Sequence, residues 1–397
     1  MTDTDSREKL WSRWDAMTID ELMTRHSCKW TQTHPDTGER LLGSGVAEHD
    51  FCLPRPIEDV LIKEVRDGVL GYPCATAASN LVRSFTGFTA ARYGWEVDTS
   101  QVRITADVLS VLRALIMAVT EPGDGVIIPT PAYWVFRTIP PELGRTLIEV
   151  PSVRKDGKWV LDTDAIAAAV KAGAKVAVLC NPWNPTGRVL SGEELDAFAE
   201  ATIGNGAWVF SDEIHAPLTL PGYTHTPLVA HNADYGARTV TAMAASKAFN
   251  IPGLKCAQTI ITDPDVAEIM DTPLSHMASG ASTPGIIASS VGYREGVPWL
   301  DSACAYIDSV MGEVRQMVTA NTGIVMDRPE ATYISLWDCT GTPQAARPFA
   351  AAMDAGVAGN DGAGVGTGFE SFIRLNFGTG RAVAHEIAKR VIAGVNA

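Results

Sequence analysis

The chain has 397 residues, of which 46% are hydrophobic and 20% charged, a composition typical of a globular protein rather than a disordered one. Its formal net charge of −14 argues against nucleic acid as a partner, because affinity for a phosphate backbone comes chiefly from Lys and Arg. No stretch reaches the roughly 18 consecutive apolar residues that span a bilayer, and the N-terminus has no apolar signal core, so we expect a cytoplasmic protein without a membrane segment.

Between about residues 55 and 285, short β-branched runs alternate with helical patterns. This alternation is typical of an α/β fold, in which helices cover both faces of a mostly parallel sheet. In such sheets the chemistry lies at the carboxyl ends of the strands. We expect strands at residues 125–129, 176–180, 208–211, 239–243 and 258–262, and helices at 108–120, 162–172 and 192–202.

After about Pro284 the pattern changes to a long helical stretch, 299–320, followed by strand-like runs at 331–337 and 372–377. These elements predict a smaller α+β domain that packs closely against the first around one cleft. We therefore expect three parts. They are an N-terminal segment that packs on the small domain (1–54), a large domain (55–285) and a small C-terminal domain (286–397).

The first candidate site is the motif Asn-Pro-Trp-Asn-Pro-Thr-Gly at residues 181–187, directly after an expected strand. Its two prolines stop the strand and stiffen the turn, so that the amide of Asn184 is held at the carboxyl end of the strand. The motif is either a bare turn or a turn that presents this amide to a ligand.

The next expected strand runs into Asp212 and, three residues on, His215. A carboxylate at the end of an apolar strand is costly to bury unless it meets a cation or several donors. Asp212 therefore either caps the following turn or faces such a partner. His215 is either a structural histidine or a member of the same site.

Two basic residues lie in apolar surroundings. Lys247 follows an apolar run and precedes a Phe-Asn-x-x-Gly turn, and such surroundings lower the pKa of a lysine and favour its nucleophilic amine. Arg374 lies in an otherwise apolar strand, where its fork of donors suits a carboxylate. The alternative for each is a solvated surface position.

Two further patterns are not interpreted as sites. The Gly-rich run at 359–368 is followed by a strand instead of a helix, so we reject a dinucleotide fingerprint and expect a flexible loop beside the site. The seven cysteines form no CxxC pair, so we expect neither a metal site nor a disulfide framework.

Four motifs in order along the chain resemble those of the fold-type I pyridoxal-5′-phosphate (PLP) enzymes of the class I/II aminotransferase superfamily. They are Asn-Pro-x-Asn-Pro-Thr-Gly, Asp-Glu-x-His, Ser-Lys-x-Phe-Asn-x-x-Gly-Leu and Phe-Ile-Arg-Leu-Asn-Phe-Gly. Segments 46–51, 330–339 and 357–364, together with His215, resemble the MalY/PatB-type cystathionine β-lyase (C–S lyase) branch. The resemblance implies an aminotransferase-like fold, with a large, mostly parallel seven-stranded sheet between helices and a smaller α+β domain.

The resemblance also implies roles for the candidate residues. Lys247 would hold PLP as a Schiff base and remove the Cα proton of the substrate, while Asp212 would keep the pyridinium nitrogen protonated. Asn184 would donate to the phenolate oxygen of the ring, with His215 close by. Tyr133 would stack on the ring and take part in catalysis. Arg374 would bind the α-carboxylate of an amino-acid substrate, with Asn184 and Tyr133 beside it.

The phosphate of PLP would be bound from three segments. Asp107 and Val108 begin a helix whose N-terminal N–H groups suit an anion, provided that Asp107 turns its carboxylate aside. Ser246 and Lys255 would contribute from the lysine motif, in which Ala244 replaces a hydroxyl residue often found there. Tyr72 matches a tyrosine that reaches the phosphate from the neighbouring subunit, which implies a homodimer with shared active sites.

Two enzyme functions stay open at this point. A C–S β-lyase would cleave L-cystathionine or related cysteine S-conjugates to a thiol, pyruvate and ammonia, whereas an aminotransferase would pass the amino group to a 2-oxo acid. Both begin with loss of the Cα proton, and the branch-specific segments favour the lyase. A regulatory protein that only keeps the fold is disfavoured, because Lys247, Asp212 and Arg374 are all present.

Overall fold

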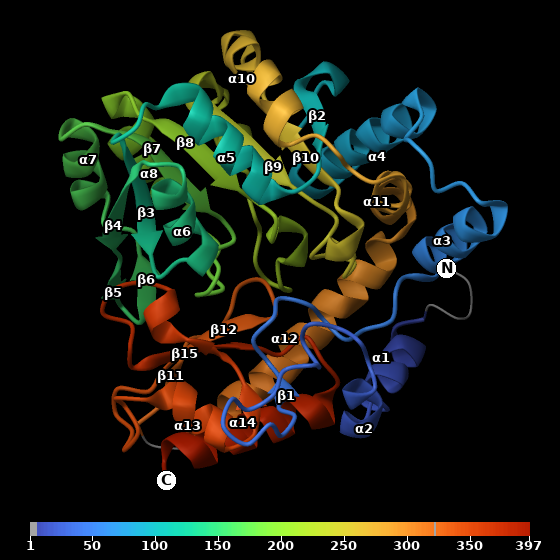
Figure 1. The fold of residues 1–397 in the computed structure, drawn as a ribbon, viewed down its shortest axis with the longest axis vertical. Coiled ribbons are helices and arrows are strands. Elements are labelled where there is room, and N and C mark those ends of the chain that lie inside the picture. The colour runs from blue at the N-terminus through green and yellow to red at the C-terminus, as the bar shows by residue number, and fades with distance from the viewer. Residues whose placement is uncertain (1–5, 321–322) are drawn as a thin grey trace.

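The computed structural model describes residues 6–320 and 323–397 (Figure 1). Its centre is a seven-stranded sheet in the order β2-β10-β9-β8-β7-β3-β4. Strands β9, β8, β7, β3 and β4 run parallel, and β10 is antiparallel to both of its neighbours. The strands are β2 (Val102–Thr105), β3 (Gly125–Thr130), β4 (Thr146–Pro151), β7 (Ala174–Cys180), β8 (Trp208–Asp212), β9 (Thr239–Met243) and β10 (Ala257–Ile260).

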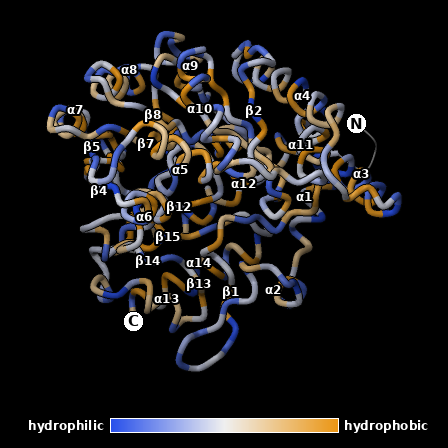
Figure 2. The backbone as a smooth tube through the Cα atoms, turned by 45° about the horizontal axis from the view of Figure 1, so that its top comes forward, coloured by the Kyte–Doolittle hydropathy of each residue, from blue (hydrophilic) through white to orange (hydrophobic). Residues whose placement is uncertain are grey.

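Helices cover both faces of this sheet. Val126 and Ile128 of β3 pack with α5 and α10 in one apolar cluster, whereas Ile127 packs with α7 and α8 in another. This alternation follows from the two-residue period of a strand that is buried on both sides. Figure 2 shows that the outer helices α7 and α8 carry both hydrophilic and hydrophobic residues. These helices are α5 (Val108–Val119), α6 (Trp134–Glu142), α7 (Thr163–Lys171), α8 (Gly192–Thr202), α9 (Leu228–His231) and α10 (Pro264–Met277).

A second, four-stranded sheet has the order β11-β12-β15-β14. The N-terminal segment lies against this C-terminal part, as the blue and red ribbons of Figure 1 show, because β1 pairs with β13. The elements are α1 (Arg7–Asp15), α2 (Ile19–Met23), β1 (Leu42–Gly43), α12 (Val297–Thr319), β11 (Val325–Met326), β12 (Ile334–Asp338), α13 (Pro348–Asp354), β13 (Val357–Ala358), β14 (Asn360–Asp361), β15 (Phe372–Asn376) and α14 (Arg381–Val395).

The seven-stranded sheet and its helices confirm the predicted fold class, while the three predicted parts stay a prediction. The expected boundary at residue 285 falls inside α11, which packs on α3 and α4. The Gly-rich run differs from the expected flexible loop, because β14 forms within it and pairs with β15. Several elements were not predicted from the sequence, among them α3 (Arg55–Asp67), α4 (Ala75–Tyr93), β2, β4, β5 (Val153–Lys155), β6 (Lys158–Val160), α10 and α11 (Thr283–Glu295).

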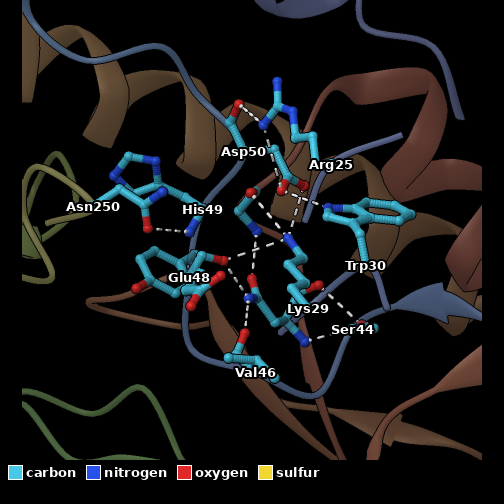
Figure 3. A network of polar contacts seen from close by, with 12 residues as sticks. Arg25, Lys29, Trp30, Ser44, Val46, Glu48, His49, Asp50 and Asn250 are labelled. Carbon is cyan, nitrogen blue, oxygen red and sulfur yellow. Dashed lines mark hydrogen bonds and ion pairs between the residues drawn. The ribbon is translucent and has the colours of Figure 1, made fainter. Parts of the chain in front are cut away.

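A buried polar network fixes the segment 44–50 to the end of β15 (Figure 3). The Lys29 Nζ, fully buried, donates to Asp50 Oδ2 at 2.8 Å, and the Trp30 Nε1 donates to Asp50 Oδ1 at 2.7 Å. The Asn376 Nδ2 donates to the carbonyl oxygens of Val46 and Glu48 at 2.5 and 2.6 Å. The segment is therefore held from both sides by side chains that water does not reach.

We expect Lys29→Met to lower the free energy of unfolding by roughly 3–5 kcal/mol, because it removes the close, buried cation and leaves the Asp50 carboxylate only the partly exposed Arg25, at 4.0 Å. Urea denaturation measures this loss. The double variant Lys29→Met/Asp50→Asn is the control, since it removes both charges and should recover a large part of the loss. A single variant as stable as the wild type would contradict the assigned role of the pair.

Candidate active site

A cavity of about 480 Å³ lies where β7, β8 and β9 end and the segment 44–50 crosses toward β15. It brings together residues that are far apart in the sequence and come from both sheets. All but one of the predicted site residues line it, and Tyr72 is the exception. The lining includes Asp107, Val108, Tyr133, Asn184, Asp212, His215, Ser246, Lys247, Lys255 and Arg374.

Lys247 follows the end of β9 and points toward the N-terminal segment. Its Nζ donates to the carbonyl oxygen of Ala47 at 2.9 Å, and the Tyr333 hydroxyl donates to the same oxygen at 3.1 Å. Burial, with a further contribution from the charge of Arg374, lowers the pKa of Lys247 to about 8. About a tenth of this amine is therefore neutral at pH 7, far more than for an ordinary lysine.

Asp212 is the last residue of β8 and is only 5% exposed. Among the described residues, the one hydrogen bond to its carboxylate comes from the backbone N–H of Ile214, at 3.1 Å. Burial, reinforced by the neighbouring Glu213, raises the pKa of Asp212 to about 7. A buried carboxylate with one hydrogen-bond donor is poorly stabilised in its charged form, so a cation bound beside it would stabilise it strongly.

Arg374 lies in β15 and is buried against three acceptors. Its Nε donates to Asn184 Oδ1 at 3.1 Å, and its Nη1 donates to the carbonyl oxygen of Gly45 at 2.8 Å and to Asn360 Oδ1 at 2.5 Å. Its Nη2 is buried without a partner in the described chain. Because Asn184 accepts through Oδ1, its amide nitrogen remains available as a donor.

The opposite end of the cavity has the features expected of an anion site. The Asp107 Oδ1 accepts from the backbone N–H and the hydroxyl of Ser110, both at 2.8 Å, so the carboxylate caps α5. Its Oδ2 pairs with the exposed Lys255 at 3.1 Å. The carboxylate thus stays at the N-terminus of α5 and occupies the N–H of Ser110, contrary to the expectation that it turns aside, while Val108 and Leu109 at the start of the helix line the cavity.

His215 and Tyr133 complete the wall. Burial, followed by the charges of Lys247 and Arg374, lowers the pKa of His215 to about 3, so its imidazole is neutral. Its Nδ1 has no hydrogen-bond partner among the described residues. Tyr133 precedes α6, and its ring makes an edge contact with Phe136 at a centroid distance of 5.6 Å.

The residues that hold Lys247 and Arg374 in place were not predicted from the sequence. Backbone carbonyl groups, here those of Gly45 and Ala47, carry no signal in side-chain patterns. Asn360 lies in the Gly-rich run, which was not interpreted as a site, although the Asn-Asp pair between Gly359 and Gly362 was visible ahead of the Arg-containing strand.

The chain belongs to the aminotransferase class I and II family, whose sequence pattern matches residues 55–391. More particularly, it is 30% identical to the cystathionine beta-lyase PatB of Bacillus subtilis (strain 168), over 95% of this chain and 98% of that protein. It is 31% identical to a cystathionine beta-lyase of Corynebacterium glutamicum, over 94% and 98% of the two chains. These matches confirm the predicted family and branch.

Solved structures agree with this relationship. The PLP-bound C-S lyase of Staphylococcus hominis has a TM-score of 0.85 at 25% identity, with 96% of this chain and 99% of that chain covered. Cystalysin from Treponema denticola, whose structure contains pyridoxal 5′-phosphate, has a TM-score of 0.85 at 27% identity, with 96% and 98% covered. Within residues 6–320 and 323–397, no helix combines the length and apolarity that crossing a membrane requires.

We expect the apoprotein of Asp212→Asn to be more stable than wild-type apoprotein at pH 8. The folded-state pKa of about 7 exceeds the ordinary 3.8, so the folded protein binds more protons than the unfolded one between these values, and wild-type stability falls as the pH rises through this range. The full difference is on the order of 4 kcal/mol. Denaturant titrations from pH 4 to pH 8 measure it.

The stabilisation by Asp212→Asn should shrink as the pH falls from about 7 toward 4. Asp164→Asn, at an exposed position in α7, serves as the control and should show no comparable pH dependence. A stabilisation by Asp212→Asn that stays constant over the whole range would contradict the raised pKa.

Proposed function

We propose that the chain is a PLP-dependent C–S β-lyase that cleaves L-cystathionine or related cysteine S-conjugates to a thiol, pyruvate and ammonia. The observation that carries the proposal is the cavity, which brings together Lys247, Asp212 and Arg374. The cystathionine beta-lyases at 30% and 31% identity over nearly the whole chain support the lyase over the aminotransferase.

The residues of the cavity fit PLP. Asp212, buried and with one donor, suits the ring nitrogen, and the amide nitrogen of Asn184 suits the phenolate oxygen. Tyr133 offers its ring for stacking, and the N-terminus of α5 with Lys255 suits the phosphate. When bound, PLP supplies an electron sink for the charge that develops at the substrate Cα.

The chain's own residues would then handle the substrate and its proton. Arg374 receives the α-carboxylate at Nη2, which has no other partner in the described chain. The Lys247 Nζ accepts the Cα proton, for which a pKa of about 8 is well suited because it lies near the operating pH. His215, neutral and buried, lies in the wall of the same cavity and adds no charge to it.

We also propose a homodimer with shared active sites. Tyr72 is 100% exposed and does not line the cavity of its own chain. Val65, Val69 and Leu70 nearby are also exposed and form an apolar strip that a second copy would cover. Tyr72 would reach the phosphate of the neighbouring subunit, where Ala244 contributes no hydroxyl. The cytoplasmic location stays a prediction.

The purified protein with PLP should release pyruvate and thiol from L-cystathionine over many turnovers without any oxo acid. Lys247→Ala should lower kcat by more than roughly 100-fold, because it removes the proton acceptor. Lys175→Ala, at an exposed position in β7, is the control and should retain activity. Conversion of the cofactor to its aminated form, reversed by an oxo acid and without pyruvate, would instead indicate the aminotransferase.

Tyr72→Phe should raise the dissociation constant for PLP roughly tenfold, since a hydrogen bond to a charged phosphate is lost. Absorbance titration of the apoprotein measures it. Mixed dimers of Tyr72→Phe and Lys247→Ala subunits contain one site with both residues intact. They should therefore regain activity at low PLP concentration that neither parent shows. Mixing without any gain would contradict the shared site.

A further inference from the structure

Arg374 is surrounded by neutral acceptors. Its partners are the side-chain oxygens of Asn184 and Asn360 and the carbonyl oxygen of Gly45. By contrast, the buried Lys29 pairs with Asp50, and no ion pair to Arg374 occurs among the described residues. Arg374 is only 4% exposed, so burial weakens the hydration of its charge, and no carboxylate among the described residues compensates it.

The three acceptors also divide the donors of the guanidinium unequally. An arginine side chain carries five N–H bonds, one at Nε and two at each Nη. One acceptor takes the Nε–H, and two acceptors contact Nη1. The Nη2 keeps both of its N–H bonds free and is itself buried.

Asn360 is held in this position by the sheet rather than by a loop. It pairs directly with Arg374 across the β14–β15 ladder, so its side chain has a fixed register against the guanidinium. Gly45 approaches from the other side. A Cβ at this position would lie 2.7 Å from the carbonyl oxygen of Gly359, which only a glycine allows without displacing the segment.

We propose that Asn360 is a positioning residue, which orients the guanidinium of Arg374 and thereby sets the affinity of this arginine for the α-carboxylate of the substrate. By binding Nη1 through a neutral oxygen, Asn360 directs an incoming carboxylate to Nη2 and leaves the charge of Arg374 available to it. A carboxylate in place of this amide would occupy the arginine itself. The inference rests on the proposed function, because it names the residue that sets the carboxylate preference of that site.

The test compares Asn360→Asp with Asn360→Ala in the PLP-loaded enzyme. Asn360→Asp keeps the shape of the side chain but adds a charge, and should raise KM for L-cystathionine roughly 10–100-fold, with kcat within about twofold. Asn360→Ala removes a neutral acceptor and should raise KM roughly 2–10-fold. Asn232→Asp is a matched control, since it makes the same chemical change at a helix cap that does not line the cavity.

Two binding probes separate positioning from a structural role. Calorimetry measures the affinity of 3-(methylthio)propanoate, which has the carboxylate without the amine, and of 2-(methylthio)ethylamine, which has the amine without the carboxylate. Asn360→Asp should weaken the first probe by the same factor as KM and leave the second, and the affinity for PLP, unchanged within about twofold.

Equal loss of both probes, or no change in either, would overturn the proposal. If Asn360→Asp does not fold, Asn360→Ala tests the proposal in its place, because this variant too should lose affinity for the carboxylate probe alone. Failure of the proposed function has a different signature. The wild type would then release no pyruvate from L-cystathionine, while the comparison of the carboxylate probe between wild type and variant would still decide the role of Asn360.

Discussion

Asp212, Lys247 and Arg374 line one cavity, and none of the three forms an ion pair with any described residue. Burial acts against the charged form of each, raising the pKa of Asp212 and lowering those of Lys247 and Arg374. If stability alone mattered, such buried charged groups would be paired with opposite charges or replaced by apolar residues. The surrounding structure therefore has to keep these three groups apart and largely shielded from solvent. A ligand with complementary charges would offset the free-energy cost of burying them.

The scaffold meets this requirement with two rigid supports. The parallel strands place Asp212 and Lys247 at their carboxyl ends, where both faces of the sheet are already covered by helices. The N-terminal segment supplies backbone carbonyl groups from the opposite side, fixed by the buried Lys29–Asp50 pair (Figure 3). Carbonyl groups can hold Lys247 and Arg374 without neutralising them, which a carboxylate could not do.

The difference between these three charged residues and the backbone groups that support them explains how much of the site could be predicted from the sequence. Asp212, Lys247 and Arg374 each stand out as a charged residue within an apolar run, and strand order brings the ends of such runs together. Their supports depend on contacts across 190 residues or more, such as Gly45 to Arg374 or Asn184 to Arg374, and on backbone atoms common to every residue. Helices α3 and α4 were not predicted either, and both pack on α11, a contact between distant segments that local sequence patterns do not show.

The two ends of the cavity treat anions differently. On the α5 side, the positive charge of Lys255 is already shared with Asp107, so a phosphate there would depend on the backbone N–H groups at the start of α5 and on hydroxyl donors such as Ser246. At the β15 end, Arg374 keeps its full charge behind neutral acceptors. A tightly held cofactor can rely on many weak donors, whereas a substrate that must enter and leave at each turnover is better selected by one strong, uncompensated charge. The asymmetry thus matches a resident phosphate at one end and an exchanging carboxylate at the other.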